Sequence, residues 1–149
     1  MSEQSREVRS DVAAWVRKAE QDWITVGSLD PSVVASVICF HCQQCAEKYL
    51  KALLTQHDEV PPRSHDLGLL LGVALQIEAG LSEISEELRL LDRYSVAIRY
   101  PGPDADEDEA AAAGRAARVV RDACRALLQL DELEADDDTT TGASGAETL

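Results

Sequence analysis

The sequence is short of aromatic residues, of positive charge and of long apolar runs. With one Phe, two Trp and three Tyr among 149 residues, a folded core has to be filled mostly by Leu, Val, Ile and Ala. Lys and Arg number 14 against 28 Asp and Glu, which gives a net charge of -14. A chain this acidic repels nucleic acid at long range, so RNA could be contacted only through a local basic patch and is not favoured by the net charge.

The lack of a long apolar run bears on the compartment. No stretch approaches the roughly 20 apolar residues that a membrane-spanning helix needs, so we expect no contact with a membrane. The first residues, MSEQSREVRSD, lack the apolar stretch of a signal peptide. We therefore expect a cytoplasmic protein in which the four cysteines are thiols rather than a disulfide framework.

Acidic residues accumulate at the end of the chain. From Asp131 to Leu149 there are seven acids and no Lys or Arg, so the preceding residues carry a net charge of only about -7. The last residues are also rich in Thr, Gly and Ser and have little apolar surface to bury. We predict one folded domain over residues 1–133 and an acidic, disordered tail over residues 134–149.

The folded part has the pattern of amphipathic helices. Apolar residues recur at spacings of three and four, Asp30-Pro31 is a typical helix start, and Pro61-Pro62 interrupts helix. The helices are expected at about residues 7–26, 31–56, 65–78 (with Ser64 as cap), 82–98 and 104–130. Four long helices and one short helix joined by short loops predict an all-α fold, an up-and-down antiparallel helical bundle.

The stretch CFHCQQCAEKYLKALL, residues 39–54, contains three cysteines and suggests a metal or redox site. On a continuous helix these thiols fan over roughly 120° and about 9 Å of rise, so they cannot converge on one metal. Cys39 and Cys42 fall on the apolar face and are expected to pack in a helix–helix contact. Cys45 lies at the border of that face near Lys48 and remains a candidate for a reactive thiol.

The opposite face of the same helix is polar. His41, Gln44 and Lys51 fall within roughly 60° of Lys48 on the helical wheel. One interpretation is a solvated face with Glu47 and Lys51 as an i, i+4 ion pair. The other is a surface for phosphate or for the acidic groups of a partner. On the last expected helix, a similar basic stripe faces away from Val119, Ala123, Leu127 and Leu130. It consists of Arg115, Arg118, Arg121 and Arg125.

Three ordered motifs resemble the HEPN domain family (higher eukaryotes and prokaryotes nucleotide-binding). The first is similar to the family's second helix and includes Phe40, His41, Gln43, Gln44, Glu47, Lys48, Leu50, Lys51, Ala52 and Leu53. The second resembles its P-x-x-H-D-L loop, with Pro62, His65, Asp66 and Leu67. The third resembles Y-x-x-x-x-R-Y-P, with Tyr94, Arg99, Tyr100 and Pro101. The resemblance covers about residues 8–130 and implies a helical bundle that often forms a homodimer.

The resemblance implies several possible activities. Many family members are metal-independent ribonucleases marked by an Arg followed, after four to six residues, by a His. The only histidines here are His41, His57 and His65, and none has such an Arg before it. Catalysis would therefore need another group, such as His65 or His41. The closest branch is instead paired with a minimal nucleotidyltransferase in a two-component, toxin–antitoxin-like module and was proposed to bind nucleotide.

These considerations leave three hypotheses. We expect a non-catalytic component that binds a nucleotide such as ATP, a nucleotidyltransferase partner, or both, without a cofactor or metal. Its binding residues would be His41, Gln44, Lys48, Lys51, His65, Asp66, Arg99 and Tyr100. Phosphate would suit the lysines and the helix-start amides near His65, and adenine could stack on Tyr100 or Tyr94, although His65-Asp66 equally suits capping and loop anchoring. The alternatives are a ribonuclease toxin, and a dimeric interaction module.

Overall fold

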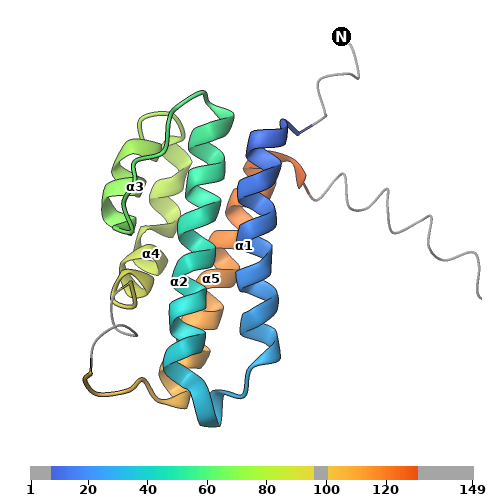
Figure 1. Cartoon of the computed structure of the whole chain (residues 1–149). Helices are drawn as coiled ribbons and strands as arrows, with labels where there is room; N and C mark the ends of the chain where they lie inside the picture. Colours follow the sequence, from blue (N-terminus) through green and yellow to red (C-terminus); the bar gives the residue numbers. More distant parts are fainter. Residues whose placement is uncertain (1–7, 96–100, 131–149) are drawn as a thin grey trace, which may run out of the picture.

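The computed structural model describes residues 8–95 and 101–130, and within these ranges the chain forms only helices (Figure 1). They are α1 (Ser10–Ser28), α2 (Pro31–Gln56), α3 (Leu67–Ala74), the 3-10 helix η2 (Ala79–Ile84), α4 (Ser85–Asp92) and α5 (Glu107–Leu128). The predicted all-α helical bundle is confirmed. The three longest helices lie side by side, and α2 contacts α1, α3, α4 and α5, so it is the centre of the bundle.

The start of α2 follows the prediction closely. Asp30 is the N-cap residue, and its Oδ1 accepts a hydrogen bond from the Ser32 amide at 2.9 Å. Pro31 occupies the first turn, where its missing amide proton costs nothing. The helix then runs to Gln56, with a kink at Val34 (φ -129°, ψ 45°).

The two short helices differ from their predicted bounds. α3 begins at Leu67 rather than at residue 65, because Asp66 and not Ser64 is its N-cap residue. Ser64 Oγ instead accepts from the Asp66 amide at 3.1 Å, which shapes the loop before the cap. The helix predicted over 82–98 is preceded by η2 and forms an α-helix only from Ser85 to Asp92. Residues 96–98 of that prediction lie outside the described residues.

The core-facing side of α5 was predicted only in part: Leu130 is buried and Ala123 and Leu127 pack against the core. Val119, expected in the core, is 41% exposed. The side that packs on the bundle is lined by small residues and by two of the four arginines, so that α5 lies close to α2 and also buries charge. Its buried residues are Ala110, Ala113, Ala116, Ala117, Val120, Cys124, Arg125 and Leu128. Arg115 and Arg118 remain exposed, and the predicted basic stripe is therefore divided between solvent and interior.

The core is aliphatic, as the scarcity of aromatic residues requires. Tyr49 and Tyr94 are its only buried aromatic residues among the described positions, and the rest is Leu, Val, Ile, Ala and Cys. None of the described helices is long and apolar enough to cross a membrane. The acidic tail predicted over 134–149 lies outside the described residues, and its boundary stays a prediction.

Candidate functional site

All four cysteines lie inside the bundle. Cys39, Cys42, Cys45 and Cys124 each have 0% of their surface exposed. Burial raises the pKa of Cys39 to about 11 and that of Cys42 to about 12, and it raises the pKa of Cys45 well above its usual value. The expectation of a packing role for Cys39 and Cys42 is confirmed, and the candidate role of Cys45 as a reactive thiol is wrong. In the described part of the chain, no group of three or more His, Cys, Asp or Glu is arranged to hold a metal.

The polar stripe of α2 lies between α1 and the loop that precedes α3, and its first cluster is centred on Asp22 of α1. This aspartate is only 7% exposed. His41 Nδ1 lies 2.8 Å from Asp22 Oδ1, and Lys48 Nζ lies 2.6 Å from Asp22 Oδ2. One buried carboxylate therefore holds both a histidine and a lysine, whose side chains keep 26% and 23% of their surface exposed.

The second cluster is centred on Glu47 of α2, whose side chain is 3% exposed. Lys51 Nζ donates to Glu47 Oε2 at 3.2 Å, and His65 Nδ1 lies 2.9 Å from Glu47 Oε1. Lys51 also lies over the Trp15 ring, 5.5 Å from its centroid, and is 6% exposed. The predicted ion pair between Glu47 and Lys51 is thus present. The prediction that these two residues lie on a solvated face is wrong, because α1 and the loop before α3 cover them.

Buried amides anchor the loop that carries His65. Gln43 is fully buried, and its Nε2 donates to the His65 carbonyl at 3.0 Å. Gln44 Nε2 donates in turn to Gln43 Oε1 at 2.7 Å. Because a carboxylate can only accept, His65 Nδ1 must carry the proton that faces Glu47. In the neutral ring this leaves Nε2 as an acceptor, on a side chain that is 55% exposed.

The helix start after His65 is already occupied by carboxylates. Asp66 Oδ1 accepts from the Leu69 amide at 3.1 Å, and Asp92 Oδ1 accepts from the Leu67 amide at 2.9 Å. These two amides are therefore not free for a phosphate. Asp66 caps α3 and His65 anchors the loop. This is one of the two roles predicted for the pair.

A third cluster joins α1, α2 and α5 and was not predicted from the sequence. Both Arg121 Nε and Arg121 Nη2 donate to Glu20 at 2.7 Å, and Tyr49 Oη donates to the same carboxylate. Arg125 Nη1 donates to Tyr49 Oη at 3.0 Å. Burial acts to raise the pKa of Glu20, but the hydrogen bonds from Arg121 and Tyr49 outweigh it and hold the pKa below its usual value. Burial and the hydrogen bond to Glu20 raise the pKa of Tyr49 well above its usual value.

The structure brings six of the eight predicted binding residues into one region. We call this region the α2 polar face; it comprises His41, Gln44, Lys48, Lys51, His65 and Asp66. The other two, Arg99 and Tyr100, lie outside the described residues. Tyr94 does not suit the predicted stacking of adenine, because it is only 8% exposed and its hydroxyl lies 3.5 Å from Glu109 Oε2.

Glu47 was predicted as the partner of Lys51, whereas the other two acidic centres, Asp22 and Glu20, were missed. Asp22 nevertheless had a signal in the sequence. Asp22 follows Ala19 by three residues and precedes Val26 by four, so it lies on the apolar stripe of α1. A carboxylate at such a position needs a buried cationic partner. The polar stripe of α2 contains two lysines, Lys48 and Lys51. A pairing of Asp22 with one of them could therefore have been inferred from the sequence.

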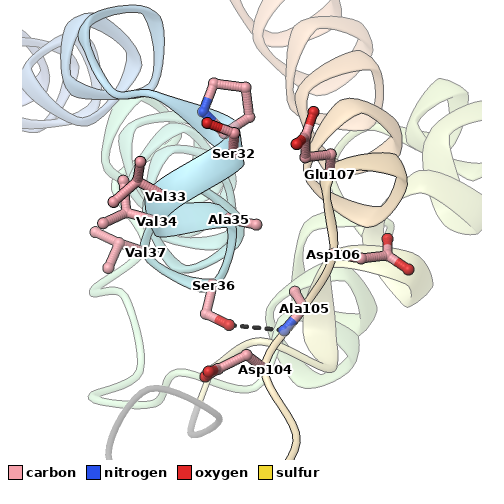
Figure 2. Close-up of a pocket in the computed structure, with 11 residues that line it drawn as sticks. Ser32, Val33, Val34, Ala35, Ser36, Val37, Asp104, Ala105, Asp106 and Glu107 are labelled. Atoms are coloured by element: carbon pink, nitrogen blue, oxygen red, sulfur yellow. Dashed lines mark hydrogen bonds between the residues drawn. The ribbon is translucent and has the colours of Figure 1, made fainter.

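A cavity of about 470 Å³ lies at the other end of α2, where its first turn faces the segment leading into α5 (Figure 2). Residues 31–37 and 104–107 line it, and Ser36 Oγ accepts from the Ala105 amide at 2.8 Å across it. Its charged side chains are all acidic, namely Asp104, Asp106 and Glu107. The cavity therefore repels phosphate, and it is not an alternative nucleotide site.

Comparison with known proteins gives a family and no individual relative. Residues 12–127 match the family model of the HEPN domain. No curated protein and no solved structure has a significant match to the chain. The matched range includes all the described residues of the α2 polar face, so the predicted resemblance is confirmed.

Proposed function

Because the chain belongs to the HEPN domain family, we propose that it is a non-catalytic component that binds a protein partner through the α2 polar face. One observation carries this proposal: both lysines of the face are already paired with buried carboxylates, Lys48 with Asp22 and Lys51 with Glu47. What the face offers to a ligand is therefore hydrogen-bond acceptors rather than free positive charge.

The acceptors can be named. In the described structure, Gln44 Oε1 and the second ring nitrogens of His41 and His65, which are acceptors in the neutral ring, have no hydrogen-bond partner. The other polar atoms of the same side chains are held by Asp22, Gln43 and Glu47, so the acceptors are fixed in place before a partner arrives. A preorganised face of this kind loses little side-chain entropy on binding and suits a partner rich in amide, hydroxyl or cationic donors.

The same geometry argues against a phosphate ligand such as ATP. A phosphate needs unpaired cations or free amides. The lysines of the face are paired, Lys51 is 6% exposed, and the amides of Leu67 and Leu69 are bonded to carboxylates. Of the two ligands predicted for this chain, the geometry thus favours the protein.

The family suggests who the partner is. The proposed partner is a minimal nucleotidyltransferase in a cytoplasmic two-component, toxin–antitoxin-like module, and the support is the resemblance of the three motifs to that branch. Homodimerisation stays a prediction, to be measured by light scattering coupled to size-exclusion chromatography. The ribonuclease alternative has no specific support, since the Arg…His motif is missing from the sequence.

Co-elution tests the proposal. The full chain is mixed with the minimal nucleotidyltransferase encoded nearest to its gene and passed over a size-exclusion column. We expect a complex that Gln44→Leu weakens about tenfold, because the acceptor Gln44 Oε1 is lost. Gln56→Leu is the matched control, since Gln56 lies at the end of the same helix, is equally half-buried and is expected to leave binding unchanged.

Two results would count against the proposal. Separate elution of the two unmodified proteins at high concentration would exclude this partner. Cleavage of single-stranded RNA by the purified chain in the presence of EDTA, lost in His65→Ala, would replace the proposal with the ribonuclease alternative.

A further inference from the structure

A groove of about 300 Å³ lies between α4 and α5 and shares no residue with the α2 polar face. Glu86 and Glu87 line it from α4, and Arg115 lines it from α5. Its apolar lining includes Leu90, Ala112 and Val119. Val119 is 41% exposed, so part of this apolar lining is accessible to a partner.

Glu87 is the unusual residue of the groove. Its Oε2 is the one buried side-chain nitrogen or oxygen among the described residues that has no hydrogen-bond partner. Its Oε1 also accepts no hydrogen bond there but is not buried, so it contacts solvent. A carboxylate that is half removed from water and has no donor is destabilising. The first turn of α4 favours negative charge at this position, but it donates no hydrogen bond to Oε2.

No cationic side chain of the described residues forms an ion pair with Glu87. Arg115 lines the same groove, yet it is exposed and forms no ion pair with a described residue. Glu86 adds a second negative charge beside Glu87. The groove therefore attracts a positive charge from outside, and its apolar lining suits an aliphatic chain that ends in that charge. Arginine and lysine side chains have this combination.

We propose that the groove between α4 and α5 receives an arginine or lysine side chain of a protein partner. The cationic end lies on the Glu87 carboxylate, and the methylene stem lies on Leu90 and Val119. Arg115 at the rim is then placed to pair with an acidic residue of the same partner. Because this surface is separate from the α2 polar face, it would hold its partner whether or not the proposed function is correct.

A peptide titration followed by NMR tests the groove. The probe is acetyl-Ala-Arg-Ala amide, and its matched control is the same peptide with citrulline, which has the shape of arginine without its charge. We expect saturable shifts of the Leu90, Ala112 and Val119 amides with the arginine peptide only. Glu87→Gln should weaken binding about tenfold, and Glu86→Gln, on the exposed neighbouring carboxylate, should change it by less than about twofold.

Each other outcome would overturn the proposal. Equal shifts with the citrulline peptide, or equal effects of Glu86→Gln and Glu87→Gln, would show that the Glu87 carboxylate does not bind the cationic end of the peptide side chain. Shifts of the same amides that grow with protein concentration in the absence of peptide, and vanish in Glu87→Gln, would assign the groove to a second copy of this chain. Unchanged binding in Ala112→Leu, which fills the groove, would place the peptide elsewhere.

Discussion

Replacing Glu20 by Gln tests whether the cluster between α1, α2 and α5 stabilises the bundle by charge. The substitution keeps the size of the side chain and removes its negative charge. Glu20 accepts hydrogen bonds from Arg121 Nε and Nη2, both at 2.7 Å, and from Tyr49 Oη. The neutral amide would keep at most one carbonyl oxygen for these three donors, and its own NH₂ group would face the arginine.

The expected cost follows from the burial of the partners. A hydrogen bond to a charged group contributes about 1.5–3 kcal/mol to stability. The side chains of Glu20 and Arg121 are 24% and 21% exposed, so water can replace part of what is lost. We therefore expect Glu20→Gln to lower the free energy of unfolding by about 2 kcal/mol, less than the loss of one partner in a fully buried pair.

The cost should depend on pH in a defined direction. Burial raises the pKa of Glu20, but the hydrogen bonds from Arg121 and Tyr49 bring it below the ordinary value of 4.5 in the folded state. A depressed folded-state pKa adds stability that is complete above 4.5 and is lost as the pH falls through the folded-state value. Urea unfolding followed by circular dichroism should show the full difference between the variant and the unmodified chain at pH 7 and a shrinking difference below pH 4.5.

Asp122→Asn provides the control. Asp122 Oδ1 lies 3.8 Å from the same arginine, but its side chain is 63% exposed. We expect a change below about 0.5 kcal/mol at either pH. Equal effects of Glu20→Gln and Asp122→Asn, or a Glu20→Gln effect that does not change with pH, would refute the assignment of a stabilising charge to Glu20.

Three further substitutions or reactions are predicted together. Lys51→Ala should cost about 3 kcal/mol in urea unfolding, because it leaves Glu47 buried without its lysine, and Glu47→Gln in the same chain should recover part of the loss; additive effects would argue against the pair. The four buried thiols should not react with Ellman's reagent at pH 8 until the chain is unfolded, and fast labelling of one thiol in the native state would contradict its burial. Asp30→Ala should cost about 1 kcal/mol, since the cap of α2 is lost, whereas an unchanged unfolding midpoint would show that Pro31 alone sets the helix start.

The sequence predicted best where local signals act alone. α2 begins and ends as predicted because Asp30-Pro31 and the residues after Gln56 specify its ends without reference to the rest of the chain. Cys39 and Cys42 were placed in the core by the angle between successive residues. α3 was predicted too long because two candidate caps, Ser64 and Asp66, lie within three residues. The start of α4 was misplaced because η2, which has no side-chain cap to signal it in the sequence, precedes α4.

The candidate site was predicted in its residues but not in its chemistry. His41, Lys48 and Lys51 were recognised as one polar face, yet what they can bind depends on their contacts with Asp22 and Glu47. Asp22 lies 26 residues from Lys48 along the chain, so their contact exists only after α1 packs on α2. The contact of Arg121 with Glu20 likewise exists only after the helices pack, since the two residues are 101 positions apart along the chain. Helical periodicity says which residues share a face, but not which face of another helix will cover them.

Calorimetric titration of the full chain with ATP tests most directly whether the α2 polar face lacks free positive charge. Because Lys48 is held by Asp22 at 2.6 Å and Lys51 by Glu47 at 3.2 Å, we expect no saturable heat up to about 1 mM ATP, which corresponds to a binding free energy weaker than about -4 kcal/mol. Saturable binding at micromolar ATP that Lys48→Ala abolishes would contradict the pairing of these lysines as the property that determines what this face binds.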